Sequence, residues 1–335
     1  MTSKEKMIHV LSNQPIERPP VFPLIMFLAA DRLGVSYRQF ATDGQIMADA
    51  QIKLYETFSI DAITACSDAF RVSADLGAEV HFPENQTPHG APLVINESDL
   101  NALKRPDALN RNGRMGDRVK GVRQMVKAVG AECFVLGWVD LPFAEACSLC
   151  GVSEFMMMLY DNPELAHKIM DFLTDIVIDF CLVQLDEGAD MIGCGDAVAS
   201  LISAEAYRDF VLPYEQRVFK AIKAAGGQGK LHICGNTTFA MPYMRESGAD
   251  LFNVDHLVDF DTAIKVYGKE GLPFKGNLDP VGDILQSDVS SIKSKVQSLC
   301  MKARNYPYII SAGCEIPATV SDEQFHAFCN AASSS

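Results

Sequence analysis

Eight short apolar runs recur along this chain, and most of them are separated by longer amphipathic stretches. Each run has the length of a buried strand, whereas intervening segments such as 204–225 and 289–303 show helical periodicity. Parallel strands that alternate with helices eight times are typical of a (β/α)8 TIM barrel, which is the fold we predict. The predicted strands are residues 20–25, 61–66, 133–139, 191–195, 230–234, 251–255, 273–276 and 308–312.

A doubly wound open sheet is the alternative fold. Such a sheet would usually carry a Gly-rich phosphate loop after its first strand, and none follows residues 20–25. No Ser-rich or Gly-rich linker divides the sequence, so we expect residues 1–335 to form a single domain. Two segments are predicted additions to the barrel. Residues 1–18 would form an N-terminal helix that covers it, and residues 77–105, rich in Gly and Pro, a hairpin-like insertion after the second strand.

Polar side chains stand at or just after the C-terminal ends of the predicted strands. In a barrel these ends meet at one rim, which is the active face. Reactive groups at the ends of so many separate strands would be a coincidence if they served only the fold. The set comprises Asp68, Asp140, Asp196, His232, Cys234, Asp255, Asn277, Asp279 and Cys314.

Three of these residues predict a metal site. His232 and Cys234 are two positions apart at the end of a strand, so their side chains point to the same side. Cys314 ends the last strand, between Gly313 and Glu315. One imidazole and two thiolates favour zinc, and three protein ligands leave the open position that is typical of catalytic zinc. The alternative is a hydrogen-bonded core histidine among buried cysteines.

The carboxylates near this rim allow two interpretations each. Asp196 follows the fourth strand, where it is either the N-cap of the next helix or a carboxylate that orients a ligand or substrate. The same alternatives apply to Asp68 after the second strand. Glu315 follows a predicted ligand and is either an orienting acid or a transient fourth ligand. Asn277 and Asp279 lie in a polar turn, and turn chemistry alone explains both residue types.

The bulk composition narrows the class of protein. The net charge is -14 and the pI is about 4.9, which argues against nucleic acid as a partner. No secretory signal and no apolar run long enough to cross a membrane are apparent. The 10 cysteines lack the spacing of a disulfide framework. We therefore expect a cytoplasmic protein that does not enter a membrane.

The sequence resembles the uroporphyrinogen decarboxylase superfamily, and within it the zinc-dependent cobamide methyltransferase branch. The resemblance runs nearly end to end, and the H-x-C motif with a late G-C-E motif is specific to the methyltransferase branch. It is carried by the segments 15–23, Ser67-Asp68, Gly137-Trp138 with Pro142-Phe143, Asp196 with Val198-Ala199-Ser200, 210–214, 232–238, 276–280 and 311–315.

The chain departs from the true decarboxylases in one region. Those enzymes carry an M-R-Q-A-G-R signature that holds substrate carboxylates, whereas residues 25–32 here read Ile-Met-Phe-Leu-Ala-Ala-Asp-Arg. Asp68 matches the catalytic aspartate of the decarboxylases by position. Without the cationic clamp, an acidic protein with few arginines near the mouth is a poor match for a tetrapyrrole with many carboxylates.

The resemblance implies methyl transfer between a corrinoid and a thiol such as coenzyme M, through a zinc-bound thiolate. The chain has no D-x-H-x-x-G corrinoid motif, so the methylcobamide is expected on a separate corrinoid protein. The implied roles are catalytic for Asp196, Glu315 and Asp68, and cofactor-binding for Trp138, Asn277 and Asp279. The alternatives are a decarboxylase-like lyase, a methyltransferase with a non-thiol acceptor such as tetrahydrofolate, and a non-catalytic protein of corrinoid metabolism.

Overall fold

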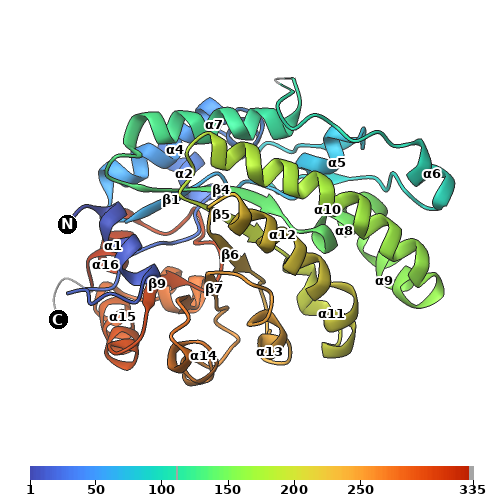
Figure 1. Cartoon of the computed structure of the whole chain (residues 1–335). Helices are drawn as coiled ribbons and strands as arrows, with labels where there is room; N and C mark the ends of the chain where they lie inside the picture. The colour runs from blue at the N-terminus through green and yellow to red at the C-terminus, as the bar shows by residue number, and fades with distance from the viewer. Residues whose placement is uncertain (111, 332–335) are drawn as a thin grey trace.

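A computed structural model describes residues 1–110 and 112–331, and within them a curved parallel sheet of seven strands forms the centre of the molecule (Figure 1). The strands follow one another in chain order around the sheet, and every neighbouring pair is parallel. They are β1 (Ala62–Thr64), β4 (Phe134–Asp140), β5 (Met191–Gly195), β6 (Gly229–His232), β7 (Leu251–Asn253), β8 (Phe274–Leu278) and β9 (Tyr308–Ala312).

The predicted first strand, residues 20–25, is not a regular strand, and the prediction of eight regular strands is wrong on this point. Only two isolated parallel bridges occur there, from Val21 to Ile310 and from Leu24 to Glu315. Prolines occupy positions 19, 20 and 23. Because proline has no backbone N–H, this segment cannot donate a continuous ladder of hydrogen bonds.

The same segment nevertheless joins the two edge strands of the sheet. Phe22 N donates to the carbonyl of Ile310 at 2.9 Å, and Ile310 N donates to the carbonyl of Pro20 at 2.8 Å. On its other side, Asp61 N donates to the carbonyl of Val21 at 2.7 Å, immediately before β1. The extended segment therefore lies between β9 and β1, an arrangement that agrees with a TIM-like barrel.

Helices cover the outer face of the sheet, and α4, α7, α10 and α12 run along it in Figure 1. The helix predicted at 289–303 is α15, but the helix predicted at 204–225 is two helices, α11 and α12. The break falls where Pro213 follows Leu212, since proline cannot donate the hydrogen bond that would continue α11. The helices are α1 (Ser3–Leu11), α2 (Phe27–Leu33), α3 (Tyr37–Thr42), α4 (Gly44–Thr57), α5 (Arg71–Asp75), α6 (Glu97–Ala102), α7 (Arg114–Val129), α8 (Pro142–Cys150), α9 (Val152–Asp161), α10 (Pro163–Asp186), α11 (Ala204–Phe210), α12 (Leu212–Ala224), α13 (Met241–Met244), α14 (Phe260–Val266), α15 (Val289–Ala303) and α16 (Asp322–Asn330), with the short turns η1 (Ala197–Leu201), η2 (Gly268–Glu270) and η3 (Pro280–Leu285).

The two predicted additions occupy opposite ends of the fold. Residues 77–105 contain a short antiparallel pair, β2 (Val80–His81) with β3 (His89–Gly90), followed by α6. At the other end, Met7 and Val10 of α1 pack against strand side chains in a small apolar cluster that includes Phe22, Phe134 and Leu251. The N-terminal helix thus covers the end of the sheet from which the strands begin.

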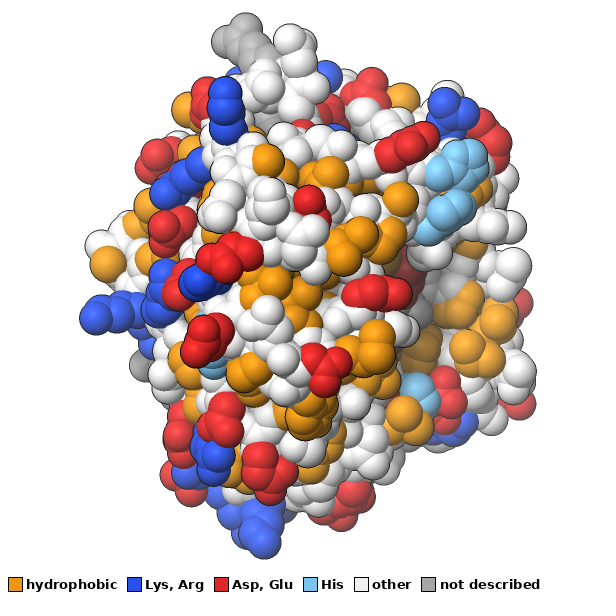
Figure 2. Space-filling model, turned by 90° about the vertical axis from the view of Figure 1, so that its right-hand side faces the viewer, with side chains coloured by type: hydrophobic (Ala, Val, Ile, Leu, Met, Phe, Trp, Pro, Cys, Tyr) orange, Lys and Arg blue, Asp and Glu red, His pale blue; other side chains and the backbone are white. Residues whose placement is uncertain are grey.

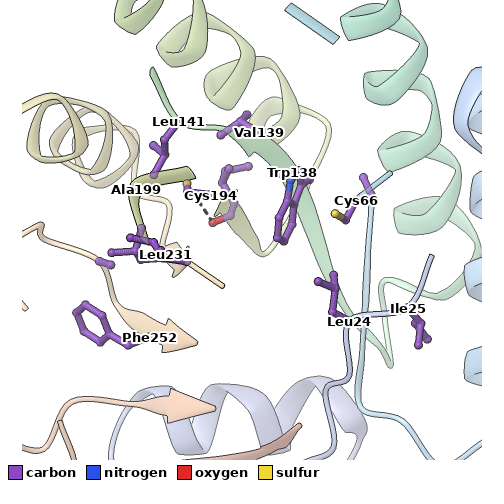
Figure 3. Close-up of a cluster of buried hydrophobic side chains, with 14 of the residues drawn as sticks. Leu24, Ile25, Cys66, Trp138, Val139, Leu141, Cys194, Ala199, Leu231 and Phe252 are labelled. Carbon is purple, nitrogen blue, oxygen red and sulfur yellow. Dashed lines mark hydrogen bonds between the residues drawn. The ribbon is translucent and has the colours of Figure 1, made fainter. Parts of the chain in front are cut away.

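A larger apolar cluster joins side chains of the sheet to those of the surrounding helices and loops. Figure 3 shows part of it, with Leu231 of β6 and Phe252 of β7 on one side and Trp138 projecting from β4 toward Leu24. No helix within the described residues combines the length and apolar character needed to span a membrane. The strands all end on the side of the molecule where α8 and α9 lie, and this shared edge carries the polar residues of the next section (Figure 1).

The junction between β1 and segment 20–24 yields a stability prediction. The buried carboxylate of Asp61 accepts hydrogen bonds from Val21 N at 2.8 Å, Ser3 Oγ at 2.9 Å and Lys6 Nζ at 2.8 Å. Asp61→Ala should lower the free energy of unfolding by about 3 kcal/mol, because it leaves three hydrogen-bond donors without an acceptor. Urea denaturation followed by circular dichroism measures the change. Asp61→Asn, which keeps one acceptor, should lose less, and equal stability of all three proteins would contradict the role of this carboxylate.

Candidate metal centre

The three predicted metal ligands come together at the C-terminal edge of the sheet. His232 is the last residue of β6, Cys234 follows two positions later, and Cys314 follows β9. His232 Nε2 lies 3.0 Å from Cys234 Sγ, and the two sulfur atoms lie 3.2 Å apart. One ligand atom from each residue lies within 4.8 Å of the other two. An imidazole and two thiols that converge in this way form a donor set suited to zinc, with room for a further ligand.

The backbone around the two cysteines is shaped by glycine. Gly235, directly after Cys234, adopts a φ of 91°, a left-handed conformation that favours glycine. A Cβ on Gly313, directly before Cys314, would clash with the backbone nitrogen of His256. Asn253 Nδ2 also donates to the carbonyl of Gly313 at 2.9 Å, so β7 holds the end of β9 in place. The Gly313-Cys314 pair is therefore positioned by a close approach that only glycine permits.

The electrostatics of the trio favour metal binding. The hydrogen bond from Cys234 and, to a smaller extent, the contact with His232 lower the pKa of the Cys314 thiol to about 4, although burial opposes this shift. The same contact, together with burial, raises the pKa of Cys234, so the two thiols share one proton. Burial lowers the pKa of His232, which keeps the imidazole neutral and able to bind a metal.

Asp196 supports the trio from the neighbouring strand. Its backbone N–H donates to the carbonyl of His232 at 2.9 Å, and its side chain is fully buried. The carboxylate makes no capping hydrogen bond to η1, the helical turn that follows it. Instead, Oδ1 accepts from Ala144 N of α8 at 2.8 Å, while burial and Glu215 raise the pKa of the acid well above its ordinary value. Asp196 thus links β5 and α8 to the histidine ligand.

Asp68 is held in a buried network of charges. Its two carboxylate oxygens accept from Arg114 at 2.6 and 2.9 Å, and Ser67 Oγ donates to it at 2.6 Å. Burial alone would raise the pKa of Asp68, but Arg114 and Arg71 outweigh it and hold the pKa well below its usual range. Arg71 also pairs with Asp140 at the end of β4. Both arginines near this edge are therefore already engaged by acids.

Glu315 connects the metal centre to α2. Its Oε1 accepts from Phe27 N at 2.7 Å and from Met26 N at 3.1 Å. Burial, aided by the adjacent Cys314, raises the pKa of Glu315 to about 7. The carboxylate therefore anchors the start of α2 beside the second cysteine ligand.

The three residues with an expected cofactor-binding role occupy different environments. Asn277 Nδ2 donates to the carbonyl of Val258 at 2.7 Å, which ties β8 to the loop after β7. Asp279 accepts from Val281 N at 2.9 Å in the turn that begins η3. Trp138 is only 3% exposed and faces His232, with their ring centroids 6.0 Å apart. Asn277 thus lies near the end of β8 and Asp279 directly after it, whereas Trp138 is buried in β4.

The face around the metal centre is apolar and acidic. Figure 2 views the molecule from the right-hand side of Figure 1, and hydrophobic side chains gather on this face with acidic side chains among them. The exposed apolar residues that follow the ends of β5, β7 and β8 are Leu201, Leu257 and Val281. A face on which exposed apolar side chains gather is typical of a surface that binds another molecule.

Sequence reasoning did not find four residues that contribute to this region. Asn253 and the two arginines, Arg71 and Arg114, gain their roles from contacts distant in sequence. Lys275 is the fourth, a fully buried lysine in β8. For Asn253 and Lys275 the available signal was alternation along a strand, since residues two positions apart point to the same side. The two arginines begin α5 and α7, where this signal does not apply.

Comparison with known proteins places this fold and site in a family. The sequence model of the family described as uroporphyrinogen decarboxylase (URO-D) matches residues 2–335. The chain belongs to the uroporphyrinogen decarboxylase family.

Relatives in this family carry two kinds of names. A methylcobamide:CoM methyltransferase from Methanosarcina acetivorans is 27% identical, with 94% of this chain and 93% of that protein covered. A uroporphyrinogen decarboxylase from Nocardia farcinica is 31% identical over 74% of this chain and 70% of that protein. Among solved structures, a methyltransferase from Methanosarcina mazei superposes with a TM-score of 0.90, at 20% identity, over 100% of this chain and 99% of that chain. The last comparison establishes the fold.

The shared proton of the cysteine pair can be tested by alkylation. In metal-free protein we expect iodoacetamide to modify Cys314 at nearly its full rate at pH 6, because the lowered pKa keeps it a thiolate until the pH falls toward about 4. An ordinary thiol, with a pKa of about 8.5, loses this reactivity below pH 8. Peptide mass spectrometry of timed samples measures the rate. In Cys234→Ser the profile should move to higher pH, and a wild-type midpoint near 8.5 would refute the assignment.

Proposed function

We propose that this chain is a zinc-dependent methyltransferase that moves a methyl group between a corrinoid and a thiol. The convergence of His232, Cys234 and Cys314 at the mouth is the observation that carries this proposal. The family relationship to a protein named methylcobamide:CoM methyltransferase supports it. The decarboxylase relatives share the family but do not account for a set of one nitrogen and two sulfur donors.

The ligand atoms are His232 Nε2 and the sulfur atoms of both cysteines. Zinc held by these three residues would keep one position open for an incoming thiol. It would favour the thiolate form of that thiol and make it a better nucleophile. The protein's own part is to keep the imidazole neutral by burial and to hold the two sulfur atoms close together. Zinc held by two thiolates and a neutral imidazole would have no net charge before the substrate binds.

The surrounding carboxylates are assigned supporting parts in the reaction. Asp196 fixes the histidine strand, and Glu315 holds α2 beside Cys314. Asp68, engaged by Arg114, would shape the wall of the mouth through that pair. The raised pKa of Glu315, about 7, gives it the capacity to exchange a proton near neutral pH.

The corrinoid is proposed to arrive on a separate protein that docks at the mouth. The exposed Leu201, Leu257 and Val281 provide apolar contact area there. Asn277 and Asp279, at the end of β8, are assigned to the side that meets the corrinoid. Trp138 would support the floor of the site, since its ring is buried. The 10 free cysteines fit a reducing compartment, and we place the protein in the cytoplasm.

The charges near the mouth favour this function over tetrapyrrole decarboxylation. Arg71 and Arg114 pair with Asp140 and Asp68, so neither is free to hold a substrate carboxylate. Arg32, in the region where decarboxylases carry their arginine signature, contacts Asp322 and the carbonyl of Val320 at the outer end of α2. A non-thiol acceptor such as tetrahydrofolate is the second candidate within methyl transfer, and the assay below distinguishes it.

Zinc content and turnover test the proposal together. Purified wild-type protein should hold about one zinc per chain with mixed sulfur and nitrogen ligation by X-ray absorption. Cys314→Ser should lose most of this zinc, because it removes one of three protein ligands. Demethylation of methylcobalamin by a panel of thiols, followed by visible absorbance, should proceed with wild type and fall by at least about 100-fold in the variant.

Cys300→Ser provides the matched control. Cys300 is a buried cysteine of α15 away from the trio, and its substitution should leave zinc content and turnover unchanged. Wild type without zinc after reconstitution under reducing conditions would overturn the proposal. Turnover with tetrahydrofolate but with no thiol would favour the second candidate acceptor.

A further inference from the structure

Two lysines lie fully buried in the interior of the sheet, close to the metal centre. Lys230 of β6 and Lys275 of β8 are both 0% exposed. Neither Nζ makes a hydrogen bond or an ion pair with any residue that the structure describes. Buried lysines are rare unless they are paired, because a charged amine loses its hydration when it is removed from water. A pair of them without a carboxylate partner needs a physical explanation.

Sheet register places both lysines next to the histidine ligand. Lys230 precedes His232 by two positions on the same strand, so both side chains point to the same side. His232 pairs with Asn253 of β7, and Asn253 pairs in turn with Lys275 of β8. The histidine and Lys275 therefore stand at one level of the sheet, separated by a single strand.

The two amines are enclosed by aromatic rings. Lys275 Nζ lies 3.9 Å from the centroid of the Phe22 ring, and Lys230 Nζ lies 5.3 Å from the same centroid. Lys230 Nζ also lies 4.6 Å from the Trp138 ring, which projects into the interior in Figure 3. Aromatic faces attract cations, so these contacts favour the charged form of both amines.

Toward the start of the strands the interior is apolar, and toward their ends lie the thiols of Cys234 and Cys314. The small cluster that includes Phe134, Leu136 and Ile309 closes the side toward α1. Burial, together with the charge of Lys230, lowers the pKa of Lys275 well below its ordinary value, and the opposing effects of Cys314 and Cys66 are smaller. A negative charge on Cys314 or on a ligand beside it would therefore stabilise the ammonium form of this amine.

The net charge expected of the metal centre suggests a role for Lys230 and Lys275. Zn²⁺ with two thiolates and a neutral imidazole has no net charge, and an incoming thiolate would make the centre negative by one. Burying an uncompensated charge is costly, and a nearby charge of opposite sign reduces that cost. We propose that Lys275, with Lys230 beside it, supplies the positive charge that stabilises an anionic ligand at the open position of the metal centre. This inference rests on the proposed function, since it assumes a thiolate at that position.

A consequence is selectivity between ligands of different charge. A neutral ligand such as imidazole adds no negative charge to the centre and gains nothing from the lysine. Removing the positive charge should therefore weaken thiolate binding and leave imidazole binding nearly unchanged. A purely structural role for Lys275 would change both affinities together.

Cobalt substitution makes these affinities measurable without turnover. Co²⁺ is loaded into metal-free protein, and the visible and near-ultraviolet spectrum reports ligand binding at the open position. Wild type and Lys275→Met are each titrated at one fixed pH with 2-mercaptoethanol and, separately, with imidazole. We expect the dissociation constant for 2-mercaptoethanol to rise about tenfold in the variant, the size of a modest buried charge interaction. The constant for imidazole should change less than about twofold.

Matched variants separate charge from packing. Ser311→Ala alters a buried polar side chain of β9 without changing charge and should leave the ratio of the two constants as in wild type. Lys275→Arg keeps the charge and should keep most of the thiolate preference. Lys230→Met should also weaken thiolate binding selectively. It replaces Lys275→Met in the experiment if circular dichroism shows that Lys275→Met does not fold.

The outcomes distinguish the two proposals. Wild type that binds no Co²⁺, or that binds Co²⁺ but no thiol, would overturn the proposed function and the lysine inference with it. Wild type that binds thiol, together with an unchanged thiolate-to-imidazole ratio in the folded lysine variant, would overturn only the lysine inference. A selective loss of thiolate affinity supports both.

Discussion

The hydrogen bonds that hold residues 20–24 between β9 and β1 are the constraint on which the rest of this structure depends. Seven parallel strands form a continuous ladder from β1 to β9. This short extended segment joins the two edge strands, β9 and β1, in the part of the chain that the structure describes. The curvature of the closed sheet brings the end of β9 toward the end of β6, although two strands separate them. Without that curvature Cys314 would not face His232 and Cys234. Backbone hydrogen bonds that close the sheet therefore also bring the three candidate ligands together.

The second organising principle is compensation of buried charge. Around the mouth, acids and arginines are paired, as Asp68 is with Arg114 and Asp140 with Arg71. In the interior the pattern differs, because Lys275 and its neighbour have thiols and aromatic rings around them in place of carboxylates. The low polarizability of such surroundings strengthens every remaining charge interaction.

Much of the fold could be predicted from sequence because its strands are short apolar runs with reactive residues at their ends. The convergence of the three candidate ligands was predictable for the same reason, since His232 and Cys234 share one side of a strand and Cys314 ends another. The irregularity of segment 20–25 depends on its prolines, which a purely hydrophobic pattern hides. The break between α11 and α12 likewise depends on one residue, Pro213, inside an otherwise helical pattern.

What the sequence could not supply were pairings between distant segments. Nothing local to Asp68 indicates that Arg114 will bind it, because the two meet only when α7 packs beside α5. The buried state of Lys275 was equally hidden, since a lysine in a strand is usually exposed to solvent. These contacts arise from closure of the sheet and from helix packing, which act over the whole chain.

The arrangement of the ligands also governs when the centre can form during synthesis. Two ligands belong to β6 and its loop, but the third follows β9, the last strand of the sheet, and β9 is also needed to seat the segment at residue 21. A nascent chain that lacks β9 therefore has two of the three candidate ligands and an open sheet. The three side chains can come together only once the last strand is in place, so a metal bound by all three would report that the whole sheet has closed.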